Sequence, residues 1–401
     1  MVDNNAWAAR FRAELEGNIL PYWQRTVIDR RRGGFFGEVD SSGAVHPEAP
    51  RASVINTRIL WTFSAGARRL DPAYRDTADW AYDAVATRFW DEAFGGLYWL
   101  IDPAGRPLSD RKQIYAQAFG IYALAEHHRA TGEGASLALA RRLFGLIDEH
   151  SRDPANLGYV EALGRDWSAL ADMRLSDKDI NCPKSMNTHL HVLEGYTNLL
   201  RVWRDPLLVA RHKELLQVML DRIVSGGHFK LFFDQDWTSL SDHVSFGHDI
   251  EGSWLLVEAA AMVGDAALTA QTRKVALAMA DAVLAEGVDE DGSVFFEADG
   301  HGNLVDATKH WWVQAEAVVG FFNAWQLSGE ERFLTASRRV WDYIDARVID
   351  RVHGEWYAKL TRRGVPLTDG SDPDAYIVGP WKCPYHNARL CYEMMGRLGE
   401  T

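Results

Sequence analysis

The chain has 401 residues, of which 47% are hydrophobic and 25% charged, so it holds enough apolar material for a large core and shows no compositional sign of disorder. Its formal net charge of -13 arises from mixed acidic and basic residues, without a basic stripe that could neutralise phosphates, which argues against nucleic acid as a partner. The first residues lack the apolar run of a signal peptide, and no segment approaches the roughly 18 apolar residues of a membrane span. We therefore expect a cytoplasmic protein that does not enter the membrane.

The three cysteines are Cys182, Cys383 and Cys391. Their number is odd and no two of them have C-x-x-C spacing, so neither a disulfide framework nor a zinc site is indicated. We expect all three to be reduced and structural.

An internal repeat gives the strongest signal for the fold. A glycine-led, aromatic-rich stretch followed by a polar turn recurs six times, starting at Gly33, Gly95, Gly158, Gly226, Gly292 and Gly354. Successive glycines lie 62, 63, 68, 66 and 62 residues apart. Aromatic and β-branched runs that end in turns such as D-S-S-G and D-P-A-G are typical of short hairpins.

Helical periodicity fills the intervals between these hairpins, with room for two helices in each. Including one helix before the first hairpin, the pattern predicts twelve helices, over residues 6–29, 52–70, 74–90, 111–131, 136–150, 186–203, 207–224, 247–263, 268–285, 308–327, 332–349 and 384–398. Six hairpin-linked pairs predict an all-α fold: a closed (α/α)6 barrel, or toroid, in which alternate helices form an inner ring, with short β-hairpins at one mouth and residues 1–401 as one domain. An open solenoid is the alternative, but it would need polar capping repeats that the sequence does not show.

The helix that directly follows each hairpin carries unusual residues near its start. These are Arg58, Tyr115, Asn187 with His191, His248 with Glu251, Trp312 with Glu316, and Trp381 with His386. In a ring of parallel inner helices, their side chains would face one another across one mouth of the barrel. The sequence thus predicts a site at that mouth.

Two of the histidines are candidates for a general base. His248 and Glu251 are three residues apart and share a helix face, so the carboxylate could orient the imidazole. His386 follows Pro384, a favoured first residue of a helix, and the positive end of the helix dipole favours the neutral imidazole that a base needs. The alternatives are a hydrogen-bonded core histidine at 248 and a capping or packing histidine at 386.

A metal site is not indicated. Asn187, His191 and Glu194 share one helix face, whereas His189 points about 200° away from His191. A helical zinc site would instead use histidines at positions i and i+4. Histidines, a guanidinium, an amide, an acid and tryptophans in one cavity favour a sugar site, since indole faces stack on sugar C–H faces and polar groups bind hydroxyls.

Four motifs closely resemble those of the cellobiose 2-epimerase family, a branch of the N-acylglucosamine 2-epimerase superfamily. They are N-T-H-L-H-V-L-E-G-Y-T-N-L from Asn187, S-F-G-H-D-I-E-G-S-W-L-L from Ser245, K-H-W-W-V-Q-A-E from Lys309 and W-K-C-P-Y-H-N from Trp381. The resemblance runs from about Ala6 to the C-terminus. Small departures at Ile180, Cys182 and Gly195 touch none of the polar positions of the motifs.

The resemblance implies epimerisation without a cofactor at C2 of the reducing-end sugar in β-1,4-linked disaccharides, through ring opening and a cis-enediolate. Cellobiose would give glucosyl-mannose, and lactose would give epilactose. By position, His248 and His386 would be the acid/base histidines, and His191 would assist at O1 and O2. Arg58 and Asn187 would stabilise the enediolate, and Glu251 would orient His248. Tyr115, Asp179 and Glu316 would contact the substrate, and Trp312 and Trp381 would stack on the sugar rings.

The residues themselves agree with that chemistry. Removing a proton α to an aldehyde needs a base whose pKa lies near neutrality and a cationic cradle for the oxyanion, which histidine and Arg58 provide. The sequence has no G-x-G-x-x-G after a strand, so a nicotinamide route is not indicated.

Four rival functions remain open at this point. An aldose-ketose isomerase of the mannose/fructose type and an N-acylglucosamine 2-epimerase would use the same barrel. A glycoside hydrolase would need a carboxylate pair such as Glu251 and Glu316 but would not explain the three histidines. A non-catalytic sugar-binding protein would have no use for basic imidazoles. The natural disaccharide depends on loops such as residues 226–243 and 363–379, and we expect a monomer, with a dimer as the alternative.

Overall fold

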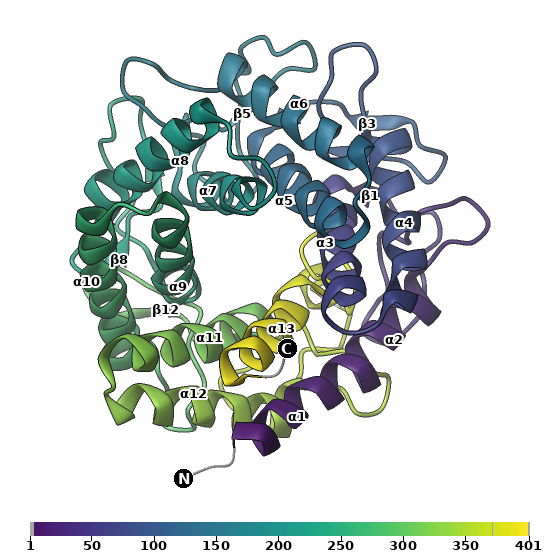
Figure 1. The fold of residues 1–401 in the computed structure, drawn as a ribbon. Coiled ribbons are helices and arrows are strands. Elements are labelled where there is room, and N and C mark those ends of the chain that lie inside the picture. Colours follow the sequence, from purple (N-terminus) through teal and green to yellow (C-terminus); the bar gives the residue numbers. More distant parts are fainter. Residues whose placement is uncertain (1–3, 371, 400–401) are drawn as a thin grey trace.

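The computed structural model describes residues 4–370 and 372–399, and most of them are helical. The helices form two concentric rings (Figure 1). The inner ring consists of α3 (Ser53–Arg69), α5 (Ile114–Thr131), α7 (Met186–Leu200), α9 (Phe246–Val263), α11 (Trp311–Ser328) and α13 (Tyr385–Leu398). The outer ring consists of α1 (Asn4–Glu14) with its continuation α2 (Leu20–Tyr22), α4 (Arg75–Ala84), α6 (Gly134–His150), α8 (Pro206–Val218), α10 (Ala266–Ala282) and α12 (Glu331–Tyr343).

The inner ring closes on itself. Each inner helix contacts the next along the chain, and α13 contacts α3, so the last helix lies beside the first inner helix (Figure 1). An open solenoid, the alternative fold, would keep these two helices apart. The prediction of a mainly helical fold made of hairpin-linked helix pairs is confirmed.

The two rings differ in how much of each helix they bury. Every residue of α5 from Ile114 to His127 is buried, because an inner helix faces its neighbours, the outer ring and the central axis at once. The outer helix α8 buries only one stripe, which includes Leu208, Leu215 and Leu216. An inner helix such as α5 is therefore buried on nearly every side, whereas an outer helix such as α8 is buried along one face.

The six glycine-led stretches are hairpins, as the sequence predicts. Five outer helices in the described chain end in a single π-helical turn, namely η2 (Trp23–Val27), η4 (Val85–Phe89), η5 (Met219–Ile223), η6 (Val283–Gly287) and η7 (Ile344–Val348). An antiparallel pairing then closes each hairpin, through Ile28 and Phe35, Trp90 and Leu97, Arg152 and Tyr159, Val224 and Phe229, Val288 and Val294, and Ile349 and Trp356. Gly158 illustrates the need for glycine, since its φ is 77° and a Cβ there would lie 2.6 Å from Nε2 of His189.

Short strands complete the hairpin side of the molecule. Two three-stranded sheets contain β1 (Arg51–Ala52), β2 (Leu100–Ile101) and β3 (Pro107–Ser109), and β10 (Val244–Ser245), β11 (Glu297–Ala298) and β12 (Leu304–Asp306). The two-stranded pairs are β4 (Lys112–Gln113) with β5 (Ala162–Leu163), β6 (Lys184–Ser185) with β9 (Phe232–Phe233), β7 (Val224–Ser225) with β8 (His228–Phe229), and β13 (Lys309–His310) with β14 (Lys359–Leu360). All named pairings are antiparallel, for example Arg51 opposite Ile101. Several of these strands end where an inner helix begins, so they fix the height of its first turn.

A buried ion pair repeats at these junctions. An acid from the hairpin binds a cation just before the next inner helix, in the pairs Asp29 with Arg51, Asp91 with Lys112, Asp153 with Lys184, Asp289 with Lys309 and Glu355 with Lys382. The side chains of Lys112 and Asp91 are both fully buried, with Nζ 3.0 Å from Oδ2. Each pair ties the end of an outer helix to the start of the following inner helix.

The structure differs from the predicted boundaries at a few places. The predicted helix over residues 6–29 is divided by a π turn, η1 (Leu15–Ile19), before α2 and by η2 after it. Pro21 lacks the N–H that a regular helix would use, which disturbs the hydrogen-bond ladder at this point. The helix predicted from residue 308 begins at Trp311, because Lys309 and His310 form β13. Two 3-10 turns, η3 (Pro72–Tyr74) and η8 (Pro373–Ala375), lie in the connections.

Within the residues that the structure describes, no helix combines the length and the apolar character that a bilayer crossing requires.

The repeated ion pair leads to a stability prediction. We expect Lys184→Met to lower the free energy of unfolding by about 3 kcal/mol, because it leaves Asp153 buried without its cation. The matched control is Lys213→Met, since Lys213 pairs with Asp265 at the surface and its side chain is 52% exposed. That variant should lose less than about 1 kcal/mol. Urea unfolding of both variants measures the difference, and equal losses would contradict a special contribution of the junction pair.

Candidate active site

Each of the six inner helices carries at least one predicted site residue near the hairpin end of the ring. Arg58 comes from α3, Tyr115 from α5, Asn187 and His191 from α7, His248 from α9, Trp312 and Glu316 from α11, and His386 from α13. Arg58, Tyr115, His191 and His386 are each no more than 5% exposed. Tyr115, His248, Trp312 and His386 lie in the first turn of their helices, whereas Arg58, His191 and Glu316 lie one turn deeper.

The indole of Trp312 contacts two of the three histidines. Its ring centroid lies 4.8 Å from that of His248 and 5.6 Å from that of His386. These imidazoles come from α9 and α13, on either side of α11, which carries the tryptophan. Trp312 therefore separates two candidate bases at close range.

Desolvation and nearby cations keep both imidazoles neutral, although His248 is half-buried whereas His386 is buried. Desolvation, followed by the charges of His191 and Arg58, lowers the pKa of His248 to about 3. Desolvation also lowers the pKa of His386 well below its usual value, with further contributions from Arg58 and Arg389. The predicted neutral state of His386 is thus explained first by burial and nearby cations rather than by the helix dipole.

Arg58 is held beneath this pair. Its Nη2 donates a hydrogen bond of 2.6 Å to the hydroxyl of Tyr115, and its guanidinium lies 4.2 Å from the ring centroid of Phe119 and 5.0 Å from that of Tyr385. Within the described chain, its Nε has no hydrogen-bond partner. A fixed cation with an unused donor suits an anion that forms during a reaction.

His191 has a carboxylate partner on its own helix. Its Nδ1 lies 2.8 Å from Oε2 of Glu194, and its ring contacts the edges of Tyr115 and Phe119 at centroid distances of 5.0 and 4.7 Å. Although burial raises the pKa of Glu194, the charge of Arg389 and the hydrogen bond from His191 outweigh it and lower that pKa to about 2. An ionised Glu194 therefore holds the third imidazole.

The orienting role expected for Glu251 is wrong. Nδ1 of His248 lies 2.8 Å from Oγ of Ser245, and Glu251 is hydrogen-bonded to Arg389 instead. The physical reason is competition, because a buried carboxylate gains more from a guanidinium than from a neutral imidazole that has a hydroxyl partner. Desolvation and the charge of Glu316 raise the pKa of Glu251 to about 7.

Glu316 is placed behind a histidine. Its Oε1 lies 2.7 Å from Nδ1 of His386 and accepts a hydrogen bond of 2.7 Å from Nη2 of Arg389, while Oε2 accepts one from the indole of Trp254. Both carboxylate oxygens are thus used within the protein. In the free protein Glu316 thus supports His386 and Arg389, and its expected contact with the substrate stays a prediction.

Three other predicted residues lie nearer the outside. Trp381 precedes α13, and its ring lies 6.1 Å from those of Trp99 and Tyr115. Asn187 is half-buried, and its Oδ1 has no hydrogen-bond partner among the described residues. Asp179 is half-buried in the connection before α7 and accepts a hydrogen bond from the backbone N–H of Ser176.

Arg389 is the central residue that the sequence reasoning missed. Its Nη1 donates to Glu194 and to the hydroxyl of Tyr385, and its Nη2 donates to Glu251 and Glu316. Its side chain is 1% exposed. One signal could have revealed it: a lone arginine in the apolar stretch A-R-L-C-Y of the last inner helix, three residues after His386.

One group of residues has the composition of a metal site. Ligand atoms of Glu251, Glu316 and His386 lie within 4.8 Å of one another. Nη2 of Arg389 already binds both carboxylates, so a protein cation occupies the place that a metal ion would take. His189 is not part of any such group, since its two ring nitrogens bind the backbone of Ser185 and Tyr159.

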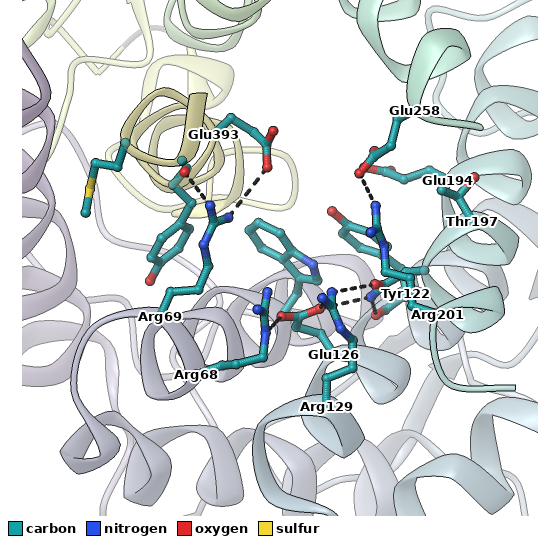
Figure 2. Close-up of a pocket in the computed structure, with 15 residues that line it drawn as sticks. Arg68, Arg69, Tyr122, Glu126, Arg129, Glu194, Thr197, Arg201, Glu258 and Glu393 are labelled. Carbon is teal, nitrogen blue, oxygen red and sulfur yellow. Dashed lines mark hydrogen bonds and ion pairs between the residues drawn. The ribbon is translucent and has the colours of Figure 1, made fainter. Parts of the chain in front are cut away.

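A separate cavity of about 540 Å³ opens at the opposite end of the ring (Figure 2). It is lined by the C-terminal halves of inner helices, and its charged residues are Arg68, Arg69, Arg129, Arg201, Glu126, Glu194, Glu258 and Glu393. The arginines are paired with acids, as in the bonds from Arg68 and Arg129 to Glu126. The bases lie at the hairpin end, so this cavity is not the candidate active site, although Glu194 takes part in both.

Comparisons with known proteins agree with the fold and with these motifs. The family model described as N-acylglucosamine 2-epimerase (GlcNAc 2-epimerase) matches residues 34–377. A cellobiose 2-epimerase from Bacteroides fragilis is 44% identical over 387 residues, covering 96% of this chain and 97% of the relative. The solved structure of cellobiose 2-epimerase from Bacillus thermoamylovorans B4167 superposes with a TM-score of 0.92 at 39% identity, covering 98% of this chain and 100% of that one.

A more distant solved structure, of D-mannose isomerase, has a TM-score of 0.83 at 20% identity and covers 97% of this chain and 98% of that one. At that identity the likeness shows a shared fold alone. The family model and the 44% identical relative both span most of the sequence. The chain belongs to the N-acylglucosamine 2-epimerase family.

Proposed function

We propose that this protein is an epimerase that inverts C2 of the reducing-end sugar in β-1,4-linked disaccharides, such as cellobiose and lactose, without a cofactor. The observation that carries the proposal is the pair of neutral imidazoles of His248 and His386, both in contact with Trp312 and both close enough to Arg58 for its charge to lower their pKa values. Two relatives with high similarity over nearly the whole chain are cellobiose 2-epimerases, which supports the disaccharide as substrate.

The chemistry follows from this arrangement. In the open-chain aldehyde, one imidazole takes the proton from C2, and the electron pair of that C–H bond forms the C1–C2 double bond of an enediolate. The guanidinium of Arg58 stabilises the negative charge that moves to O1. Because both imidazoles rest in the neutral form, the other one takes up a proton from solvent once the negative enediolate has formed and returns that proton to the opposite face of C2. The first imidazole releases its proton to solvent, so the C2 hydrogen is exchanged in each turnover.

The depressed histidine pKa values fit this cycle. In the free protein both imidazoles are held in the neutral form, which is the form that can accept a proton, and the negative charge of the enediolate raises their pKa values as it forms beside them. His191 is held by Glu194 and faces Tyr115. We infer that it assists at the O1 and O2 oxygens, while Trp312 and Trp381 stack on the sugar rings and Asn187 and Asp179 bind hydroxyls.

The same proposal extends to the architecture. We infer that the two rings of helices form an (α/α)6 barrel that acts as a single catalytic domain and as a monomer. The contact between α13 and α3 supports a closed barrel. Light scattering of the purified protein at several concentrations tests the monomer.

The decisive experiment follows the C2 hydrogen. We expect proton NMR of cellobiose and lactose incubated with the protein in D2O to show deuterium at C2 together with glucosyl-mannose and epilactose. Exclusive conversion of free mannose to fructose would instead identify an aldose-ketose isomerase. Free glucose released from cellobiose would identify a hydrolase.

Single histidine variants test the two-base mechanism. We expect His248→Gln and His386→Gln each to reduce epimerisation of lactose by at least about 1,000-fold, while each variant still exchanges the C2 hydrogen of one epimer, because one base remains on one face. His353→Gln is the matched control, since His353 is an exposed histidine of the last hairpin. Epimerisation at the wild-type rate by either active-site variant would show that its histidine is not a base.

The pKa shifts predict a pH response. Because burial holds the pKa of His248 at about 3, its neutral form is fully present at every pH well above that value. Between pH 5 and 8 the Cε1–H resonance of His248, identified with a His248→Gln variant, should therefore not move. A titration midpoint near 6.5 would show that the imidazole is solvated.

A further inference from the structure

Arg389 has no direct part in the proposed mechanism, yet it lies at the centre of the charged groups behind it. It is an inner-ring guanidinium that binds three glutamates, which come from α7, α9 and α11. Two of these glutamates hold a histidine, since Glu194 lies 2.8 Å from His191 and Glu316 lies 2.7 Å from His386. Each of those histidines is thus linked to Arg389 through one carboxylate.

We propose that Arg389 is a positioning residue, an inference that rests on the proposed function. Its charge keeps Glu316 and Glu194 ionised, and these carboxylates hold His386 and His191 with the proton on Nδ1. In that tautomer Nε2 carries the lone pair, so the nitrogen that faces away from the carboxylate is the basic one. Arg389 then determines which ring nitrogen can remove a proton from the substrate. It does so without touching the substrate.

The protonation state of Glu316 determines which partner donates in its hydrogen bond with His386. An ionised Glu316 can only accept, so Nδ1 of His386 must carry the proton. A protonated Glu316 can donate its O–H to Nδ1, which places the imidazole proton on Nε2 and removes the base from the substrate side. The two states therefore differ in whether His386 can act as a base.

Without the positive charge of Arg389, burial would favour the protonated form of Glu316, in which His386 cannot act as the base. Glu316, Glu194 and Glu251 are each no more than 3% exposed, and desolvation raises the pKa of Glu316. Glu194 and Glu251 also repel one another through their negative charges. Arg389 is the first opposing influence on the pKa of Glu316 and of Glu194, so its removal would let the cluster take up protons.

Other charged and titratable groups face the same cluster and enter its pH dependence. They are Arg58 on α3, Tyr122 on α5, His191 on α7, His248 on α9, and Tyr385 and His386 on α13. The tyrosine hydroxyls stay protonated, because burial raises the pKa of both well above its usual value. Of the cations in this set, Arg389 is the one hydrogen-bonded to all three carboxylates.

The planar guanidinium is suited to this position. Its two terminal nitrogens divide the partners, with Glu194 and Tyr385 on Nη1 and Glu251 and Glu316 on Nη2, while the ring of Trp254 lies 4.9 Å from its central carbon. A lysine would bring the same charge as a single point with three donors. We therefore expect Arg389→Lys to preserve part of the effect and Arg389→Gln to remove it.

The kinetic test is the pH profile of kcat for Arg389→Gln, Arg389→Lys and a control, on whichever disaccharide the wild-type protein converts. Loss of a paired opposite charge raises a carboxylate pKa by about two units, and below the raised pKa the ionised fraction falls about tenfold for each pH unit. We expect kcat of Arg389→Gln to fall by about tenfold for each pH unit below the raised pKa of Glu316 and to recover toward the wild-type value at higher pH, with a smaller change in KM. Arg389→Lys should lie between this variant and the wild type.

The matched control is Arg397→Gln. Arg397 lies two turns further along α13, binds Asn323 and Gln326, and is remote from the three histidines. This variant should keep the wild-type pH profile. A purely structural role of Arg389 would lower kcat by the same factor at every pH, and that result, or an unchanged profile in Arg389→Gln, would overturn the proposal.

A second readout needs neither turnover nor a stable variant. In protein labelled with 15N-histidine, long-range 15N–1H correlation distinguishes the two tautomers, and a His386→Gln sample identifies the resonance. We expect the proton of wild-type His386 on Nδ1, and a proton on Nε2 would overturn the proposal even if Arg389→Gln fails to fold. If the wild-type protein shows no exchange at C2 while the Nδ1 tautomer is found, the proposed function fails and the role of Arg389 in setting the tautomer stands.

Discussion

One cation bound to three buried carboxylates is the interaction on which the site depends. Arg389 contacts Glu194, Glu251 and Glu316 from three other inner helices, so the position of α13 within the ring and the charge of the cluster are determined together. Buried charges are costly to desolvate and are tolerated only when their hydrogen bonds are satisfied. Removing either the cation or one acid would leave the others in a low-dielectric interior. Closing the ring and assembling the site are therefore coupled through the last helix.

Much of the fold could be predicted because its signals are local. A glycine that must adopt a positive φ, an aromatic run and a polar turn mark each hairpin, and their spacing leaves room for two helices. The division of the first helix into α and π turns was not predicted, although Pro21 marks the place. Helix starts such as that of α11 were placed a few residues off because Lys309 and His310 pair with a strand from a distant part of the chain.

The sequence predicted which residues lie in the site more successfully than it predicted their hydrogen-bond partners. His191 with Glu194 and His248 with Glu251 present the same H-x-x-E spacing, yet only the first pair forms a hydrogen bond. The difference arises from Arg389, which is 138 residues away from Glu251 in sequence. Spacing along one helix predicts which side chains can meet, but competition from another helix decides which of them do.

The two ends of the ring show why burial matters to the chemistry. At the far end, arginines and glutamates of the second cavity neutralise one another in pairs, and the arginines stay partly exposed although Glu126 is buried (Figure 2). At the hairpin end, carboxylates are buried behind the histidines, and the imidazoles become neutral because water is excluded from them. A base that removes a proton from carbon must stay unprotonated, and it must also lie near the positive charge that stabilises the enediolate. Burying that positive charge is costly unless negative groups nearby balance it. The Arg389 cluster is placed where such compensation is possible, since two of its acids are hydrogen-bonded to His191 and His386.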